Sequence, residues 1–245
     1  MSKKIIFSAG GTGGHIFPAI NLMKHFSEKG YDVVLVTDKR GKKFINNISK
    51  FRSYEVVTDT PTNKGIFKKI FSFFLIFLSI FRSISIIKKE KPDLIFGAGG
   101  YVSFPISFTS KFFGLPLIIY ESNIIMGRAN RFLLSFASKV FSAHEILIID
   151  PKKGKFPDKY KNKLCTVGTV LDKKIINHVP KKILNDKQDF SILILGGSQG
   201  AEIFGKVIPK VINMLKEKNF KIQVTQQCAK NQKDEIKKFY EKNNI

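Results

Sequence analysis

Three glycine-rich stretches carry the clearest chemical signal in this sequence. They read GGTGGH at Gly10–His15, GAGGY at Gly97–Tyr101 and GGSQG at Gly196–Gly200. Each follows a short apolar run and precedes a helical pattern, so each is expected where a strand ends and a helix begins. Glycines there let backbone amides approach phosphate oxygens at the start of a helix. Three such loops favour a phosphate or diphosphate ligand over ordinary tight turns.

A histidine and a carboxylate accompany these loops. His15 follows the first glycine run at the expected start of a helix, whose positive end favours the neutral imidazole that a general base requires. The alternative is a polar residue that only hydrogen-bonds its loop. Glu121 and Asn123 follow a later strand and are expected at the same rim. There the carboxylate could hold a sugar hydroxyl, orient the histidine or simply cap its own loop.

Common nucleotide and metal signatures are absent from the sequence. It has no GxxxxGK[ST] motif and no DxD pair, and Ile16 stands where GxGxxG needs its third glycine. A Rossmann dehydrogenase is therefore disfavoured. The two cysteines, Cys165 and Cys228, form no CxxC pair. Neither a disulfide framework nor a metal site is predicted.

Alternating strands and helices would position these residues. The expected strands of the first part are 4–9, 32–37, 93–96, 117–121 and 139–142, and the expected helices are about 16–29, 103–113 and 128–138. Buried strands that alternate with helices predict an α/β fold, a doubly wound parallel sheet with helices on both faces.

A basic segment with two prolines interrupts this alternation. We expect residues 1–150 to form one Rossmann-like domain, 151–163 to connect it, and 164–245 to begin a second. The pattern restarts there, with expected strands at 164–167, 191–195 and 221–226 and helices at about 201–218 and 232–241. The second domain would be smaller than usual.

The charge balance bears on partners. Forty-two Lys and Arg against 19 Asp and Glu give a net charge of +23. The excess indicates nucleic acid, acidic lipid or phosphorylated substrates, with lysines scattered over solvated faces as an equal alternative. No nucleic-acid-binding motif is present, so no nucleic-acid partner is expected. The apolar run at the N-terminus is too short for a secretory signal, and a reducing cytosol is expected.

One phenylalanine-rich segment, Ile66–Lys91, raises the question of a membrane. Its longest charge-free block, Ile70–Phe81, is about half of the roughly 20 residues that a spanning helix needs, so it is not expected to cross a bilayer. Cations on both sides suit a helix lying in an anionic interface, and a buried core helix is the alternative. The expected membrane-facing residues are Phe74, Phe77, Phe81, Lys68, Lys69 and Arg82.

Four motifs together resemble the MurG family of peptidoglycan glycosyltransferases, in this order and spacing. They are GGTGGHIFPA at 10–19, FGAGGYVSFP at 96–105, YESNIIMGRANRFL at 120–133 and LGGSQGA at 195–201, and the resemblance extends from Lys4 to about Lys230. It implies the GT-B architecture, two Rossmann-like domains facing across a cleft, with the second domain incomplete because family members continue further.

The resemblance also implies an activity. It would be inverting transfer of N-acetylglucosamine from UDP-N-acetylglucosamine to the C4 hydroxyl of the muramoyl unit of lipid I, an undecaprenyl-diphosphate-linked acceptor. The product would be lipid II, and no metal or other cofactor would be needed. The enzyme would lie peripherally on an anionic membrane, at the cytoplasmic face of the bacterial inner membrane. The alternative is a truncated, inactive remnant that still binds membrane.

Roles for individual residues follow from the resemblance alone. His15 would be the base for the acceptor hydroxyl, and Asn123 would contribute to the nucleotide-sugar site. Further substrate contacts would come from Thr12, Gly13, Gly14 and Glu121, the acceptor diphosphate would meet Gly99, Gly100 and Tyr101, and the donor diphosphate would meet Ser198 and Gln199. The family's Val-Gly-Asn-Pro-Val-Arg is replaced by the residues of 167–172, so an arginine is missing and Lys173 is at best a partial substitute.

Overall fold

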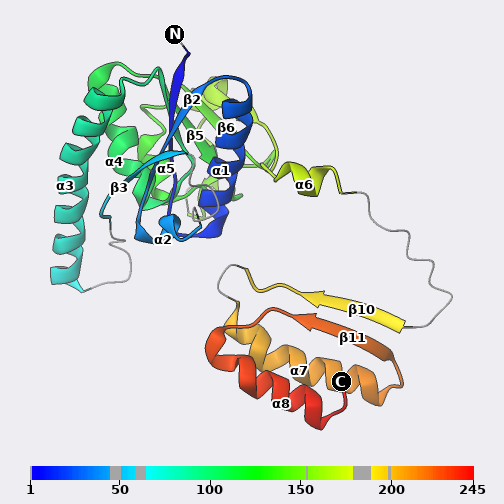
Figure 1. Cartoon of the computed structure of the whole chain (residues 1–245). Helices are drawn as coiled ribbons and strands as arrows, with labels where there is room; N and C mark the ends of the chain where they lie inside the picture. The colour runs from blue at the N-terminus through cyan, green and yellow to red at the C-terminus, as the bar shows by residue number, and fades with distance from the viewer. Residues whose placement is uncertain (1, 45–50, 59–64, 153, 179–188, 198–199) are drawn as a thin grey trace. The chain divides into compact units, whose positions relative to one another are not determined.

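The computed structural model in Figure 1 describes residues 2–44, 51–58, 65–152, 154–178, 189–197 and 200–245. The chain forms two compact units, Met1–His178 and Val179–Ile245. Each unit is described by itself.

The first unit is built on a seven-stranded parallel sheet with the order β3-β2-β1-β4-β5-β6-β9. Its strands are β1 Lys4–Ser8, β2 Asp32–Thr37, β3 Arg52–Glu55, β4 Leu94–Gly97, β5 Leu117–Glu121, β6 Lys139–Ser142 and β9 Leu164–Thr166. The chain builds outward from β1 on one side and from β4 on the other. The first two glycine loops therefore leave adjacent strands, at the point where ligands bind in open α/β sheets.

Helices cover both faces of this sheet. The helices of this unit are α1 Gly13–Glu28, α2 Lys39–Lys42, α3 Ile66–Glu90, α4 Gly100–Ser110, α5 Arg128–Leu133 and α6 Lys173–Ile176. The unit also contains the 3-10 turns η1 Lys111–Phe113 and η2 Asp158–Lys163 and a small antiparallel pair, β7 Ile148–Asp150 and β8 Gly154–Lys155. In Figure 1, α3 packs beside α4, and α4 beside α5, in one layer. The helix α1 covers the opposite face.

Strand alternation separates the core into two layers. On β1, Ile6 packs in the cluster that contains residues of α3, α4 and α5, whereas Ile5 and Phe7 pack with α1 through Ile16 and Met23. Successive side chains of a strand point to opposite faces, so both faces of this strand are buried. The predicted α/β fold is confirmed.

Two helices differ most from their predicted bounds. The helix expected at 103–113 begins at Gly100, because Gly99 and Gly100 adopt φ of 94° and 77° and turn the chain early. The helix expected at 128–138 ends at Leu133, after which a turn leads to β6.

The predicted domain boundary at residue 164 is wrong. The strand expected to open the second domain is β9, and it pairs with β6 at the edge of the first sheet. Tyr120 Oη then bonds the backbone of Gly168 and Val170, both at 3.3 Å. The expected connection 151–163 is also part of the first unit, since it contains β8 and the buried Phe156. The second unit begins after His178.

The second unit pairs two parallel strands, β10 Asp189–Ile194 and β11 Lys221–Gln226. The other elements are α7 Glu202–Glu217, a 3-10 turn η3 Lys230–Gln232 and α8 Lys233–Lys242. Ile212 of α7 and Ile236 of α8 are buried in this unit. Several large apolar side chains stay exposed on it, among them Phe190, Leu193, Leu195, Ile203 and Met214. The unit therefore presents the beginning of a Rossmann-like domain with much apolar surface uncovered.

Helix α3 buries serines and isoleucines and exposes phenylalanines. Its buried face runs along Ser72, Ile76, Ser79, Ser83, Ile86 and Ile87. The alternative of a fully buried core helix is wrong for Phe74, Phe77 and Phe81, which are about half exposed, at 54%, 55% and 54%. By length and composition alone the segment Ile70–Glu90, with a mean hydropathy of 2.3, is long and apolar enough to span a membrane. That it lies in an interface instead stays a prediction.

Candidate active site

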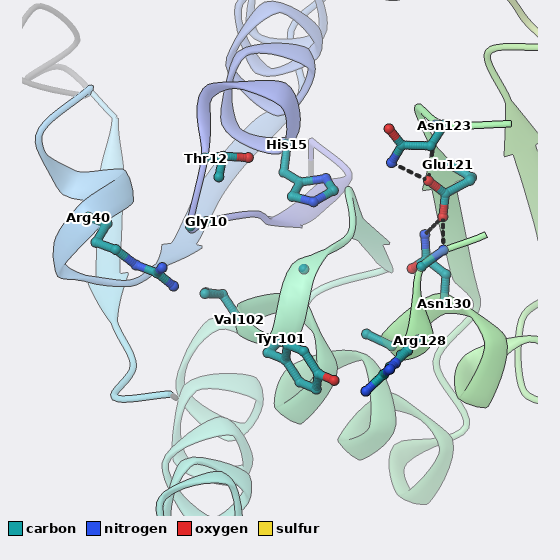
Figure 2. Close-up of a pocket in the computed structure, with 14 residues that line it drawn as sticks. Gly10, Thr12, His15, Arg40, Tyr101, Val102, Glu121, Asn123, Arg128 and Asn130 are labelled. Atoms are coloured by element: carbon teal, nitrogen blue, oxygen red, sulfur yellow. Dashed lines mark hydrogen bonds between the residues drawn. The ribbon is translucent and has the colours of Figure 1, made fainter. Parts of the chain in front are cut away.

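A cavity of about 270 Å³ opens at the carboxyl ends of β1, β4 and β5. Four loops or helix starts line it, as Figure 2 shows. The lining residues are Gly10, Gly11, Thr12, His15, Arg40, Gly100, Tyr101, Val102, Glu121, Asn123, Gly127, Arg128, Ala129 and Asn130. The cavity lies where the first two glycine loops meet, as their sequence positions predicted.

His15 lies in the first turn of α1 and extends into this cavity. A Cβ atom on Gly99 would come within 2.9 Å of His15 Nδ1, so a glycine at this left-handed position makes room for the imidazole. Burial lowers the pKa of His15 below its ordinary value of 6.5, although the Glu121 carboxylate and the backbone of Ala98 act in the opposite sense. Nδ1 is buried and forms no well-aligned hydrogen bond within the described residues. The lowered pKa favours the neutral imidazole, which is the form that can accept a proton.

Glu121 organises the loop that follows β5. Its carboxylate accepts hydrogen bonds from the backbone amides of Asn123 (3.1 Å) and Gly127 (2.9 Å). It also accepts from the side-chain amides of Asn123 and Asn130, both at 2.9 Å. Only 1% of Glu121 is exposed. Of the roles considered for this residue, the structure therefore shows loop capping, and through the capping Glu121 positions Asn123.

Asn130 is a site residue that the sequence reasoning missed. Its side-chain nitrogen also donates to the Tyr120 carbonyl at 3.0 Å, and its side-chain oxygen is buried with no partner in the described part of the chain. It lies within the third motif, seven residues after Asn123. That recurring amide was the signal that could have identified it.

Arg40 and its anchor Asp38 were missed as well. The buried Asp38 carboxylate accepts from Arg40 Nε (2.8 Å) and from the backbone amides of Gly41 (2.8 Å) and Gly11 (3.2 Å). Burial alone would raise the pKa of Asp38, but these hydrogen bonds and the Arg40 charge outweigh it and lower the pKa. Asp38 thus joins the first glycine loop to the turn that carries Arg40. The guanidinium reaches the cavity edge opposite Arg128 (Figure 2).

The remaining predicted residues divide into three groups. Gly99 lies against the His15 imidazole, while Gly13 and Gly14 lie in the first turn of α1 without lining the cavity. The third loop belongs to the second unit, where the backbone amide of Gly196 donates to Gln227 Oε1 at 3.2 Å. Ser198 and Gln199 lie outside the described residues. No cluster of three or more His, Cys, Asp and Glu suited to a metal occurs in the part of the chain that the structure describes.

The predicted membrane-facing residues lie along one helix. The exposed side of α3 carries Phe74, Phe77 and Phe81, with Arg82 also exposed. Lys68 and Lys69 occupy its first turn, and their side chains lie outside the described part. We call the exposed side chains Phe67, Phe71, Phe74, Phe77 and Phe81 the phenylalanine face.

Comparison with known families decides what kind of protein carries this cavity. The profile of the glycosyltransferase family 28 N-terminal domain matches residues 5–142, and that of the family's C-terminal domain matches residues 191–245. The chain belongs to glycosyltransferase family 28. The cavity lies within the N-terminal domain of this family, and the third glycine loop within its C-terminal domain.

Named relatives of this family 28 chain agree with one another. Proteins of Pelagibacter ubique (35% identical over 100% of this chain) and Rickettsia bellii (33% over 99%) are both called UDP-N-acetylglucosamine–N-acetylmuramyl-(pentapeptide) pyrophosphoryl-undecaprenol N-acetylglucosamine transferase. The chain spans 65% and 66% of their lengths. The resemblance predicted from the four motifs is confirmed.

Solved structures show the fold of this family 28 chain. MurG of Acinetobacter baumannii is 24% identical, with a TM-score of 0.72 over 98% of this chain and 65% of its own. The complex of Staphylococcus aureus MnaA with UDP is 14% identical, with a TM-score of 0.60 over 98% and 65%. These similarities show the GT-B fold, with the second domain partly covered by this chain.

Proposed function

We propose that this protein is an inverting glycosyltransferase that transfers N-acetylglucosamine from UDP-N-acetylglucosamine to the C4 hydroxyl of the muramoyl unit of lipid I. The observation that carries the proposal is the histidine in the cavity: His15 lies where two glycine loops meet, and burial lowers its pKa. The names of the relatives give the same sugar donor, the same transferred sugar and the same class of acceptor.

The transfer requires one proton acceptor. His15 would take the proton of the C4 hydroxyl as its oxygen attacks the anomeric carbon of the donor sugar. The bond between that carbon and the diphosphate oxygen breaks, and UDP leaves with the electron pair. Attack from the side opposite the leaving group inverts the anomeric centre. Glu121 would act indirectly, as a positioning residue, because its hydrogen bonds hold Asn123 and Asn130 at the cavity wall.

The acceptor diphosphate would lie against the two glycine loops. The N-termini of α1 and α4 point backbone amides to this region, and the helix dipoles favour an anion there. Arg40 and Arg128 contribute positive charge at the cavity edge. Arg40 is well suited to this role because Asp38 fixes its Nε and leaves the two terminal nitrogens of the fork for a ligand.

The donor would bind through the second unit. Gly197 and Gly200 adopt φ of 78° and 70°, and a Cβ on Gly196 would collide with the backbone of Ala201, so this loop needs its glycines. Ser198 and Gln199 would meet the donor diphosphate at this loop. Lys173 is a poor substitute for the missing arginine, since it pairs with Glu28 of α1.

Lipid I is a membrane lipid, so the enzyme must reach a bilayer. The phenylalanine face of α3 provides apolar area, and Arg82 lies beside it. Apolar burial at the acyl boundary, together with cations near anionic headgroups, is the physical basis of interfacial binding. We place the protein peripherally at the cytoplasmic face of the inner membrane on this ground.

Calorimetric titration with UDP-N-acetylglucosamine tests the donor assignment, with UDP-N-acetylgalactosamine as the matched control. Selective binding, with a dissociation constant of roughly micromolar order, is expected for a sugar-nucleotide enzyme. Absence of binding heat from a folded sample would remove the donor role of this chain. Intact binding to anionic vesicles in the same sample would then favour the alternative, a membrane-binding remnant without activity.

A further inference from the structure

A cluster of phenylalanine rings extends from the cavity along two helices of the first unit. We call Phe104, Phe108, Phe112, Phe132 and Phe136 the aromatic ladder. Each ring contacts at least one other ring of the ladder. Phe104 and Phe132 join the two helices with centroids 5.2 Å apart, and Phe108 contacts Phe112 at 5.3 Å and Phe136 at 5.8 Å.

The ladder begins where the cavity ends. Phe104 and Phe108 follow Tyr101 on α4 at spacings of three and four residues, and Phe112 continues this row in the adjoining turn η1. Phe132 follows Arg128 on α5 at a spacing of four, and Phe136 continues this row in the turn after α5. Residues so spaced share one side of a helix. Tyr101 and Arg128 line the same side of the cavity, as Figure 2 shows. The two aromatic rows therefore lead away from the proposed diphosphate site, the longer of them along α4, which is about 16 Å long.

Some rings of the ladder are packed against the core and others are exposed. Phe104, Phe108 and Phe136 are half-buried and pack against the core, which holds the rows in place. Phe112 and Phe132 are 68% and 55% exposed. Both exposed rings contact Phe108, and together the three rings form an apolar surface of the kind that marks a binding site. Residues 100–113 and 128–136 contain no Asp or Glu, and Lys111 Nζ lies 4.4 Å from the centre of the Phe136 ring.

From these observations we propose that the aromatic ladder binds the first isoprene units of the lipid-linked acceptor while the cavity binds its diphosphate. The proposal rests on the proposed function, which places a polyprenyl diphosphate in the cavity. A long apolar chain attached to the diphosphate must leave the cavity along some surface. The ladder is an apolar path that starts one helical turn away, and it carries no anionic group to repel the diphosphate.

Titration of the full chain with two soluble ligands tests the ladder. Inorganic pyrophosphate probes the cavity alone, and farnesyl diphosphate below its micellar concentration adds a short isoprenoid. We expect farnesyl diphosphate to bind roughly tenfold more tightly or better, because part of its chain leaves water. Phe132→Ser is expected to remove most of this advantage and to leave pyrophosphate binding unchanged.

The matched control is Phe77→Ser, which removes an equally exposed ring of the phenylalanine face. It is expected to leave both affinities unchanged. Equal affinities of the unsubstituted chain for the two ligands, or an unchanged advantage of farnesyl diphosphate in Phe132→Ser, would contradict isoprenoid binding by the aromatic ladder. Neither result would contradict the proposed diphosphate site. The proposal would also be overturned if Phe77→Ser removed the advantage of farnesyl diphosphate as well. It would likewise be overturned if Phe132→Ser weakened binding to vesicles but not binding of farnesyl diphosphate. If neither ligand binds the folded chain, the proposed acceptor site itself fails.

Discussion

At the scale of single residues, the site depends on how backbone geometry surrounds two side chains. His15 occupies space that a Cβ on Gly99 would fill, and burial lowers the pKa of its imidazole. Glu121 is saturated by donors from its own loop, so its contribution is to position amides. Both residues can be identified as candidates from the sequence. Their separate roles cannot, because those roles depend on contacts made only in the folded chain.

The titration of His15 is the first prediction. We expect its pKa below 6.5, because burial disfavours the imidazolium. In folding terms, the contribution of this depressed pKa to stability is present above the unfolded value and is lost as the pH falls through the folded value. NMR titration of the ring protons in the full chain measures the pKa, with His15→Gln assigning the signal. A midpoint at or above 6.5 would show that burial does not control this group.

Replacement of Glu121 is the second prediction. Glu121→Gln puts an amide group among the donors of Asn123, Gly127 and Asn130, so some buried hydrogen bonds are lost. The free energy of unfolding should fall by about 1–3 kcal/mol. Urea denaturation measures this fall, and Glu145→Gln on an exposed position is the control, expected to change it by less than about 0.5 kcal/mol. Equal effects of the two substitutions would refute the loop-organising role.

Arg40 shows why part of the site could not be predicted. Asp38 follows a predicted strand, yet nothing local indicates that its carboxylate would bond the Gly11 amide 27 residues away. The glycine loops could be placed because strand and helix periodicity locate their ends. A residue that reaches the site through a tertiary contact leaves no comparable pattern in the sequence.

At the scale of elements, α3 is the unusual feature. Serines and isoleucines face the core and phenylalanines face outward, which reverses the usual arrangement of a surface helix. Its C-terminus is tied to the sheet, since Glu90 accepts from Tyr54 Oη (2.5 Å) and Lys4 Nζ (3.0 Å). Burial alone would raise the pKa of Glu90, but these bonds and the nearby Arg52 lower it. The helix is thus an integral part of the first unit.

The third prediction concerns the phenylalanine face. Phe77→Asp should weaken binding to anionic phospholipid vesicles by roughly tenfold or more, because it removes an inserted ring and adds a negative charge. Unfolding stability should hardly change, since the ring is 55% exposed. Vesicle sedimentation measures the binding, and Phe17→Asp on α1, at a ring 49% exposed, is the matched control. If both variants bind as the unsubstituted chain does, α3 is not the membrane contact.

Sequence patterns located long elements better than short ones. The bounds of β2, β5, β6 and β11 are as predicted, because buried or alternating runs between turn residues leave little choice. The short β3, β7 and β8 were not predicted, since two to four partly exposed residues carry no periodic signal. Their strand form comes from pairing with neighbours.

At the scale of the whole molecule, the division between the units is set by long-range pairing. The prolines and lysines of 151–163 look like a linker, yet β9 beyond them completes the first sheet. Ion pairs from α1 to the segment after β9, Lys24 with Asp172 and Glu28 with Lys173, extend the first unit further. Composition could not show this, because a strand added at a sheet edge looks the same as one that opens a new domain.

The fourth prediction follows from this division. A chain of residues 1–178 should fold cooperatively, and one of residues 1–163 should be less stable by roughly 2 kcal/mol or more, because it lacks β9 and the Tyr120 contacts beyond it. Thermal unfolding followed by circular dichroism compares the two. Equal melting temperatures would place the boundary at residue 164 after all.

The central claim is sugar transfer to a lipid-linked acceptor with His15 as base. The most direct measurement is incorporation of labelled N-acetylglucosamine from its UDP donor into lipid I by the purified chain, beside His15→Gln. We expect saturable, lipid-I-dependent incorporation that falls by about a hundredfold or more in the variant, as loss of a general base does. No incorporation by the folded chain under conditions in which MurG of Acinetobacter baumannii is active, or equal rates with and without His15, would contradict it.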